Sequence, residues 1–288
     1  MSFSADIKKE VGKLNNLAKK EQVKYELIGY LISANTSNIN KNKIKYATES
    51  DYNINRFSKL LLNLNIEHDI NIKGKWFIIT LKKAKINQFL EIIDNKSEFI
   101  KNNTQENKRA IIRGVFLGAG SVNNPEKKYH LEISISNKEN LEFISELIKG
   151  FGVKPKILVL EDKFSIYFKD GEEISKFLAL IGASKAVLRF EDIRVERDMR
   201  GKINRIVNCE TANLNKTINA SVIQIEAIER LKKEKRFNKL NDNLKEMAKL
   251  RIENPNMPLQ ELGKLANPPV GKSGVNYRLK KIMEIANE

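Results

Sequence analysis

The residues best suited to chemistry lie near the C-terminus, where four basic side chains occur without an intervening acid. Residues 268–283 contain Lys272, Arg278, Lys280 and Lys281, and no Asp or Glu. Basic side chains neutralise the phosphates of nucleic acids, and several polar types also donate to base edges in the major groove. The pattern therefore favours DNA binding. An ordinary helical hairpin with a solvated face is the alternative interpretation.

A helix-turn-helix would position these side chains. Residues 259–266 predict a short helix, which Pro258 suits as a first-turn residue. The segment 267–271 contains two prolines and ends that helix, because proline lacks an N–H and disfavours helix just before itself. Ser273 is the expected N-cap of a second helix. The apolar stripe of this second helix consists of Val275, Leu279, Ile282 and Ala286.

The opposite face of the second helix carries the predicted DNA-binding residues. Together with Leu259 from the preceding helix, they are Lys272, Ser273, Asn276, Tyr277, Arg278, Lys280 and Lys281. The N-terminal residues of such a helix lie nearest the base edges. We expect Asn276 to bond adenine, Lys280 to reach guanine and Arg278 to contact a phosphate.

Few groups in the chain are suited to catalysis or metal binding. Cys209 is the only cysteine, which excludes an internal disulfide and favours a cytosolic address. His68 and His130 are the only histidines, which argues against a zinc site. No apolar run approaches the roughly 18 residues of a membrane span, and no signal-peptide pattern follows the first residues. We expect no cofactor, no metal and no membrane partner.

Two stretches in the first two-thirds of the chain predict the same apolar helix. Residues 27–35 and 112–120 each carry a glycine at the third position, Gly29 and Gly114, and small residues at the end. Glycine inside a helix costs about 1 kcal/mol relative to alanine, so the matched pair indicates two helices whose backbones approach closely. Further matches follow in step, such as Phe57 with Phe143, and they indicate a duplicated domain.

Each copy predicts the order helix, strand, helix, strand, strand, helix, an α+β layout with one sheet per copy and pseudo-twofold symmetry. The predicted ranges in the first copy are 24–34, 43–46, 53–64, 67–73, 75–81 and 84–93. In the second copy they are 108–119, 130–135, 140–151, 156–160, 163–168 and 172–181. The last third is helical by pattern, with further helices at 220–232 and 243–252.

Four parts are expected on this basis. Residues 1–104 form the first repeat and residues 105–183 the second. A linker over 184–219 contains an Asn-Cys-Glu-Thr-Ala-Asn segment, and residues 220–288 form an all-α helix-turn-helix domain.

Within the linker, Cys209 is expected to be a small packing group rather than a reactive thiol. Asn208, Asn213 and Asn215 are expected to cap helix starts, because Asn competes for backbone groups there.

The paired helices resemble those of the LAGLIDADG homing endonucleases, in which the eighth motif position is an Asp that holds catalytic metal. Here the eighth positions are Ala34 and Ala119. Alanine binds no metal and moves no proton, so the resemblance implies a degenerate, non-enzymatic domain. The alternative is a nuclease that recruits other acids. Glu49, Asp51 and Glu132 are the nearest in sequence, but none matches between copies.

The net charge of +16 is unevenly distributed. Residues 1–104 carry 18 basic and 11 acidic residues, residues 105–183 carry 12 and 11, and residues 184–288 carry 22 and 14. Codon bias towards lysine is the alternative explanation, but it would spread the excess evenly. The strands of the first repeat offer Lys43, Lys45, Lys73 and Lys75. We expect these lysines to contact DNA non-specifically, and the nearly neutral second repeat to remain available to a protein partner.

Three segments of the chain resemble the bacterial WhiA family: Arg113–Lys127, Ile203–Thr217 and Gly271–Leu279. The resemblance covers essentially the whole chain in the family's order. It implies a degenerate homing-endonuclease fold joined to a C-terminal helix-turn-helix, with no cofactor.

The resemblance also implies a function. The family is associated with transcriptional control, with cell division and chromosome segregation, and with sporulation in some relatives. The expected partner is double-stranded DNA in the cytoplasm, at the nucleoid, with a protein regulator or an RNA polymerase component as a further partner. A protein-interaction scaffold tethered to DNA is the remaining alternative.

Overall fold

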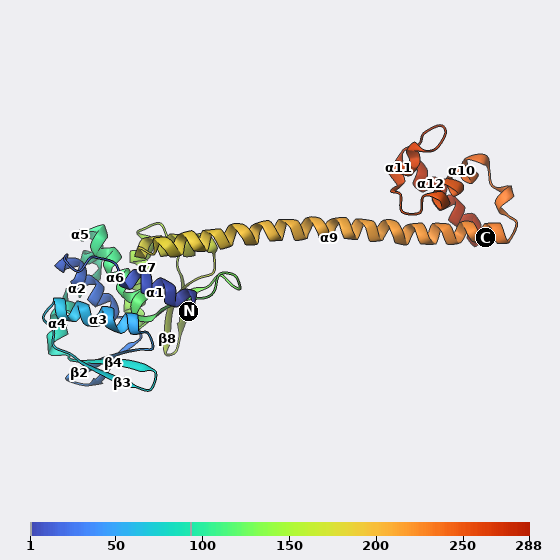
Figure 1. The fold of residues 1–288 in the computed structure, drawn as a ribbon. Coiled ribbons are helices and arrows are strands. Elements are labelled where there is room, and N and C mark those ends of the chain that lie inside the picture. The colour runs from blue at the N-terminus through green and yellow to red at the C-terminus, as the bar shows by residue number, and fades with distance from the viewer. Residues whose placement is uncertain (1, 93) are drawn as a thin grey trace. The chain divides into compact units, whose positions relative to one another are not determined.

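The structure is a computed structural model that describes residues 2–92 and 94–288, and it divides into two compact units, Met1–Asp198 and Met199–Glu288. Figure 1 shows two sheets with their helices in the first unit and short helices around the end of α9 in the second. No helix in the described part of the chain is long and apolar enough to cross a membrane.

The first unit consists of two halves with the same sheet topology. The first half contains α1 (Phe3–Gly12), α2 (Lys20–Leu31), β1 (Thr36–Asn40), β2 (Lys43–Thr48), α3 (Asp51–Asn63), β3 (Asp69–Lys73), β4 (Trp76–Lys82), α4 (Ala84–Glu91) and α5 (Lys96–Asn102). The second contains α6 (Gln105–Ala119), β5 (Gly120–Val122), β6 (Leu131–Ile135), α7 (Lys138–Lys149), β7 (Lys156–Leu160), β8 (Lys163–Phe168) and α8 (Gly171–Ile181). The antiparallel sheets have the orders β1-β2-β4-β3 and β5-β6-β8-β7, which confirms the duplicated α+β domain.

Most of the predicted elements are present within a few residues of their expected bounds, and β7 and β8 match them fully. The sequence pattern did not predict α1, α5, β1 and β5. Strand β1 is largely exposed at the edge of its sheet, so it lacks the alternation that identifies a half-buried strand. The predicted end of one helix at Ile93 lies outside the described residues.

The predicted end of the first motif helix at Ala34 is wrong, because α2 ends at Leu31. The residues that follow pair with β6 instead of continuing the helix. The N–H of Ala34 donates to the carbonyl of Ser134, and the N–H of Ser136 donates to the carbonyl of Ile32, each at 3.2 Å. This pairing joins the two halves of the unit directly through their backbones.

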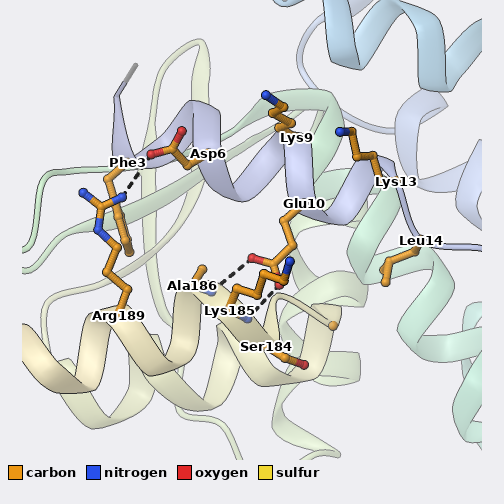
Figure 2. A pocket seen from close by; sticks show the side chains of 11 residues that line it. Phe3, Asp6, Lys9, Glu10, Lys13, Leu14, Ser184, Lys185, Ala186 and Arg189 are labelled. Atoms are coloured by element: carbon orange, nitrogen blue, oxygen red, sulfur yellow. Dashed lines mark hydrogen bonds and ion pairs between the residues drawn. The ribbon is translucent and has the colours of Figure 1, made fainter.

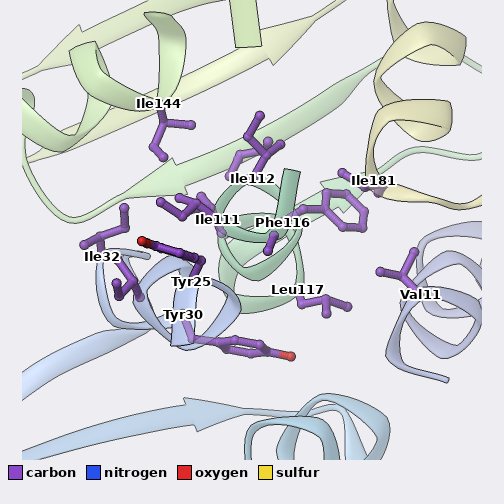
Figure 3. Packing of buried hydrophobic residues seen from close by; sticks show 14 of the residues in the cluster. Val11, Tyr25, Tyr30, Ile32, Ile111, Ile112, Phe116, Leu117, Ile144 and Ile181 are labelled. Carbon is purple, nitrogen blue, oxygen red and sulfur yellow. The ribbon is translucent and has the colours of Figure 1, made fainter. Parts of the chain in front are cut away.

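Helices α2 and α6 approach each other at two glycines, as the sequence predicts. A Cβ added to Gly114 would lie under 3.0 Å from the carbonyl oxygen of Glu26, a separation that Cβ atoms essentially never show. A Cβ added to Gly29 would likewise lie under 3.0 Å from the carbonyl oxygen of Ile111. Side chains of both helices surround this contact and fill the core, among them Tyr25, Tyr30, Ile111, Phe116 and Leu117 (Figure 3).

A buried ion pair lies beside the glycine contact. Glu26 on α2 is fully buried, and its carboxylate accepts from Nε of Arg56 at 2.7 Å and from Nη2 at 3.0 Å. Burial opposes the charge of Arg56, but the hydrogen bond and charge of Glu26 raise the pKa of its guanidinium above the usual value. Asn16 also donates to Glu26, and Arg113 of α6 lies 3.4 Å from it. The carboxylate therefore connects α2, α3, α6 and the segment before α2.

Helix α9 (Ser184–Lys233) is continuous over 50 residues. Asn208, Asn213 and Asn215 lie in its interior, so the expectation that they cap helix starts is wrong. Asn is only weakly unfavourable inside a helix, and it does not end this one. Cys209 is exposed, so its expected role as a packing group is also wrong.

The start of α9 is held by α1. The carboxylate of Glu10 accepts from the backbone N–H groups of Lys185 at 2.7 Å and Ala186 at 3.0 Å, and Asp6 pairs with Arg189 at 3.1 Å (Figure 2). The first N–H groups of a helix have no partner within it, and a carboxylate there also suits the helix dipole. Helix α1, which the sequence analysis missed, thus anchors α9 in the first unit.

The second unit is helical. After α9 come a 3-10 helix (Phe237–Lys239), α10 (Asp242–Glu253), α11 (Leu259–Lys264) and α12 (Lys272–Asn287). Its core contains Ile228 and Leu231 of α9, Leu244 and Met247 of α10, Leu262 of α11, and Val275, Leu279 and Ile282 of α12. The four buried residues predicted for the last helix are all buried, which confirms its apolar stripe.

Gly114→Ala should destabilise the first unit, because its Cβ would overlap the Glu26 carbonyl and force α2 from α6. Overpacking of this kind costs about 1–3 kcal/mol. Gly12→Ala is the matched control, since its nearest contacts would be ordinary ones at 3.9 Å. Urea unfolding followed by fluorescence of Trp76, the only tryptophan and a residue of β4, measures both. Equal unfolding midpoints would contradict the close-approach argument.

Glu26→Gln should cost about 3–5 kcal/mol of unfolding free energy, because it leaves the Arg56 guanidinium buried without a counter-charge. Glu21→Gln removes an exposed pair with Lys24, whose atoms lie 2.6 Å apart, and should cost at most about 1 kcal/mol. The same fluorescence measurement compares them. The buried pair would have no special role if the two variants lost similar stability.

Candidate nucleic-acid interface

Helix α12 begins at Lys272, two residues before the position that the sequence predicts. Its N-cap is Gly271, whose backbone is extended, with φ −72° and ψ 167°, and no side chain caps the helix. Ser273 is therefore the second helical residue, and its predicted role as N-cap is wrong. Its side chain is left at the exposed start of the helix.

One face of α12 carries polar side chains to solvent. At about 100° per residue, Lys272, Asn276 and Lys280 follow one another along a line on this face, and Ser273 and Tyr277 lie beside them. All five residues are exposed, Tyr277 by 68%. Neither Lys272 nor Lys280 has an ion pair with any described residue. These side chains can therefore donate to an external partner.

Three other predicted contact residues have partners within the unit. Arg278 lies 3.5 Å from Glu246 of α10, and only 15% of its side chain is exposed, so it braces the fold rather than standing ready for a phosphate. Lys281 pairs with Glu284 at 3.3 Å. Leu259 packs against the helical core.

Two residues that the sequence analysis did not select hold the turn before α12. A Cβ on Gly263 would lie under 3.0 Å from the carbonyl oxygen of Val270, whose N–H donates back to the Gly263 carbonyl at 2.9 Å. Glu246 accepts from the N–H of Asn267 at 2.7 Å, so one carboxylate contacts both the turn and Arg278. The glycine inside a short helix was the available sequence signal, because glycine is unfavourable there.

The outer face of the first sheet places most of its predicted lysines in solvent. Lys43 and Lys45 alternate on β2 with buried residues and are exposed, and Lys73 ends β3. Lys75 lies in the hairpin turn and pairs with Glu49 at 2.8 Å, which offsets its charge. The face is basic, although the charge of Lys75, one of the four predicted lysines, is offset by Glu49.

On the matching face of the second sheet, the acid of β6 is paired. Glu132 on β6 lies 2.8 Å from Lys163 and 3.4 Å from His130. The hydrogen bond from Lys163 holds the pKa of Glu132 at about 2, well below its usual value. The carboxylate is therefore charged and paired at neutral pH, in contrast to the basic first sheet.

The end of the helix pair, where the motif positions lie, is filled by neutral groups. Ala34 follows α2 and Ala119 ends α6. The carbonyl of Gly118 accepts from the amide of Asn35 at 2.7 Å, and the carbonyl before it accepts from the amide of Asn53 at 2.7 Å. These amides satisfy the end of α6, which the sequence analysis did not anticipate.

The acids considered for a nuclease are engaged or isolated. Glu49 and Glu132 are in the ion pairs described above, and Asp51 is the first residue of α3. Across residues 2–92 and 94–288, no three His, Cys, Asp or Glu side chains lie together in a way that could hold a metal ion.

Similarity to known proteins extends over the whole chain. Residues 39–109 and 108–200 each match the WhiA LAGLIDADG-like domain, and residues 203–286 match the WhiA C-terminal HTH domain. The chain is 41% identical to the "Probable cell division protein WhiA" of Clostridium tetani and 36% identical to that of Clostridium perfringens strain SM101. Each comparison covers 100% of this chain and 98% of the relative.

Two solved structures are similar in fold. The full-length DUF199/WhiA from Thermatoga maritima has a TM-score of 0.64 at 28% identity, over 100% of this chain and 98% of that one. The N-terminal LAGLIDADG domain of DUF199/WhiA has a TM-score of 0.56 at 25% identity, over 63% of this chain and 90% of that one. Both agree with the fold expected from the sequence.

Gly263→Ala should loosen the helix-turn-helix, because its Cβ would overlap the Val270 carbonyl. We expect a loss of about 1–3 kcal/mol. Gly274→Ala in α12 is the control, since its nearest contact would be the Val270 side chain at 3.4 Å and alanine is the better helix former. Hydrogen exchange of the α10–α12 amides reports the difference. Unchanged protection in Gly263→Ala would show that the close approach is not needed.

Proposed function

The chain belongs to the WhiA family, and we propose that it is a DNA-binding transcriptional regulator without nuclease activity that acts in cell division and chromosome segregation. The exposed polar face of α12 supports DNA binding most directly, because Lys272 and Lys280 on it are exposed and have no ion pair with a described residue. The name of the relatives, probable cell division protein, supports the cellular role. Double-stranded DNA at the nucleoid is the proposed partner, with a protein regulator or an RNA polymerase component as a second.

In this proposal α12 enters the major groove and reads bases. The amide of Asn276 can bond adenine at two positions, and Lys280 can reach the two acceptors of guanine. Lys272 at the start of the helix is suited to a nearby phosphate. Arg278 and Glu246 link α12 to α10, so the reading side chains project from a helix whose orientation is held by the domain.

The basic face of the first sheet is proposed to add non-specific contact. Lys43, Lys45 and Lys73 have no ion pair with a described residue, and exposed lysines attract phosphates whatever the base sequence. The ion pair of Glu132 with Lys163 on the second sheet supports leaving that face to a protein partner.

Asn276→Ala and Lys280→Ala should each lower the discrimination between preferred and scrambled DNA by about 1–3 kcal/mol, because each removes a base contact. The preferred sequences are first selected from a random pool with the wild-type protein, and competition binding then measures each variant. Lys239→Ala, an exposed lysine of the 3-10 helix, is the control and should keep the preference. Unchanged discrimination in both α12 variants would refute base reading by this helix.

The same assay separates the sheet from α12. Replacing Lys43, Lys45, Lys73 and Lys75 together by Gln should weaken binding to all sequences alike. It should also reduce the slope of log affinity against log salt by about 0.9 for each DNA phosphate that the variant no longer neutralises. Sequence preference should stay unchanged. If affinity and slope both match the wild type, the lysines are only a solvated face.

The protein should not cut DNA, because alanines occupy both motif positions and neutral amides fill the end of α6. Incubation of supercoiled and linear DNA with Mg²⁺ or Mn²⁺ tests this. Cleavage that purifies with the protein and disappears in Glu49→Gln or Asp51→Asn would establish the nuclease alternative instead.

A further inference from the structure

A cavity of about 260 Å³ lies within the second unit, where α9 meets the starts of α11 and α12. Its walls include Lys216 and Thr217 of α9, Arg251 of α10, Leu259 and Gln260 of α11, and Lys272 of α12. Three of these side chains are cationic, and none of the described residues that line the cavity is acidic. The lining of the cavity is therefore positively charged.

Arg251 is the most unusual of these residues, because only 1% of it is exposed. One terminal nitrogen donates to the carbonyl of Met257 at 2.9 Å and to those of Asn254 and Pro255 at 3.3 Å. Its Nε has no partner, and no carboxylate is paired with it in the described part of the chain. Burial lowers the pKa of Arg251. A buried cation without a counter-charge is costly, and an anion in the cavity would offset that cost.

The other walls add donors from independent elements. Lys216 and Lys272 are exposed. Their ammonium groups can therefore contact a bound anion without breaking an existing ion pair. Helix α12 starts at Lys272 with no side-chain cap, and its first N–H groups are suited to an anion. The hydroxyl of Thr217 already donates to the carbonyl of Asn213 at 3.1 Å, so the lysines, the arginine and the helix start supply the donors.

We propose that this cavity binds a phosphate group, held by Lys216, Arg251 and Lys272. Cations that converge from three helices suit an anion with several acceptor oxygens, whereas a carboxylate offers only two. The phosphate can come from the DNA backbone beside α12 or from a phosphorylated small molecule. The DNA source rests on the DNA binding proposed above, and the small-molecule source does not.

The first test titrates the full chain with inorganic phosphate at constant ionic strength in chloride, by calorimetry. Saturable binding is expected, and Lys216→Gln should weaken it at least tenfold. Lys216 is exposed, so this variant should fold, whereas loss of the buried Arg251 could unfold the unit. Lys249→Gln, an exposed lysine of α10 outside the cavity, is the control and should bind phosphate as the wild type does.

The second test measures the salt dependence of DNA binding for the same variants. A DNA phosphate in the cavity predicts that Lys216→Gln lowers the slope by about 0.9, whereas Lys249→Gln leaves it unchanged. If phosphate binding needs Lys216 but the slope is unchanged, the source is a small molecule. If the slope is lowered but inorganic phosphate does not bind, the source is the DNA backbone.

The proposal is overturned if Lys216→Gln changes neither the slope nor any binding of phosphate. If the wild-type chain binds no DNA at all, the proposed function fails, and the phosphate titration alone still decides the cavity.

Discussion

The contact between α2 and α6 at Gly29 and Gly114 is the constraint on which the first unit depends. With no side chains between them, the two backbones lie close enough for each half to complete the core of the other. The same approach buries Glu26, whose carbonyl faces Gly114, so its carboxylate needs internal donors. Arg56 and Asn16 supply these donors. The two glycines therefore lead to a buried hydrogen-bond network around Glu26.

At the end of this helix pair, the contacts that stabilise the fold are separate from the positions that would hold catalytic groups. Neither the glycine contact nor the buried ion pair involves the motif positions Ala34 and Ala119. Asn35 and Asn53 satisfy the carbonyls at the end of α6 with neutral amides. Since the forces that hold the helices together lie elsewhere, the fold persists with alanine where a carboxylate would be required for cleavage.

The basic residues of the second unit differ in their burial. Arg278 and Arg251 are both turned inward, one against Glu246 and the other against backbone carbonyls. Lys272 and Lys280 are exposed to solvent, where they can contact a phosphate or a base. Charge counted along the sequence treats all four alike, but burial separates the two arginines, which contact groups of their own unit, from the two exposed lysines.

The sequence alone determined the features that arise from local periodicity and the cost of glycine. The duplicated order of elements, the close helix pair and the apolar stripe of α12 follow from side chains at fixed spacing, and all three are present. It could not identify β1, because an exposed polar edge strand has no alternating pattern.

Only the tertiary structure decided features that join residues far apart in the chain. Helix α2 ends at Leu31 because the backbone groups that follow form hydrogen bonds with β6 and the residue after it. Helix α9 starts where Glu10 accepts from its first N–H groups. Arg278 lies against Glu246 and is largely buried, and cations from three separate helices line one cavity. Each depends on a partner that no local pattern specifies, because long-range contacts form only when the chain folds.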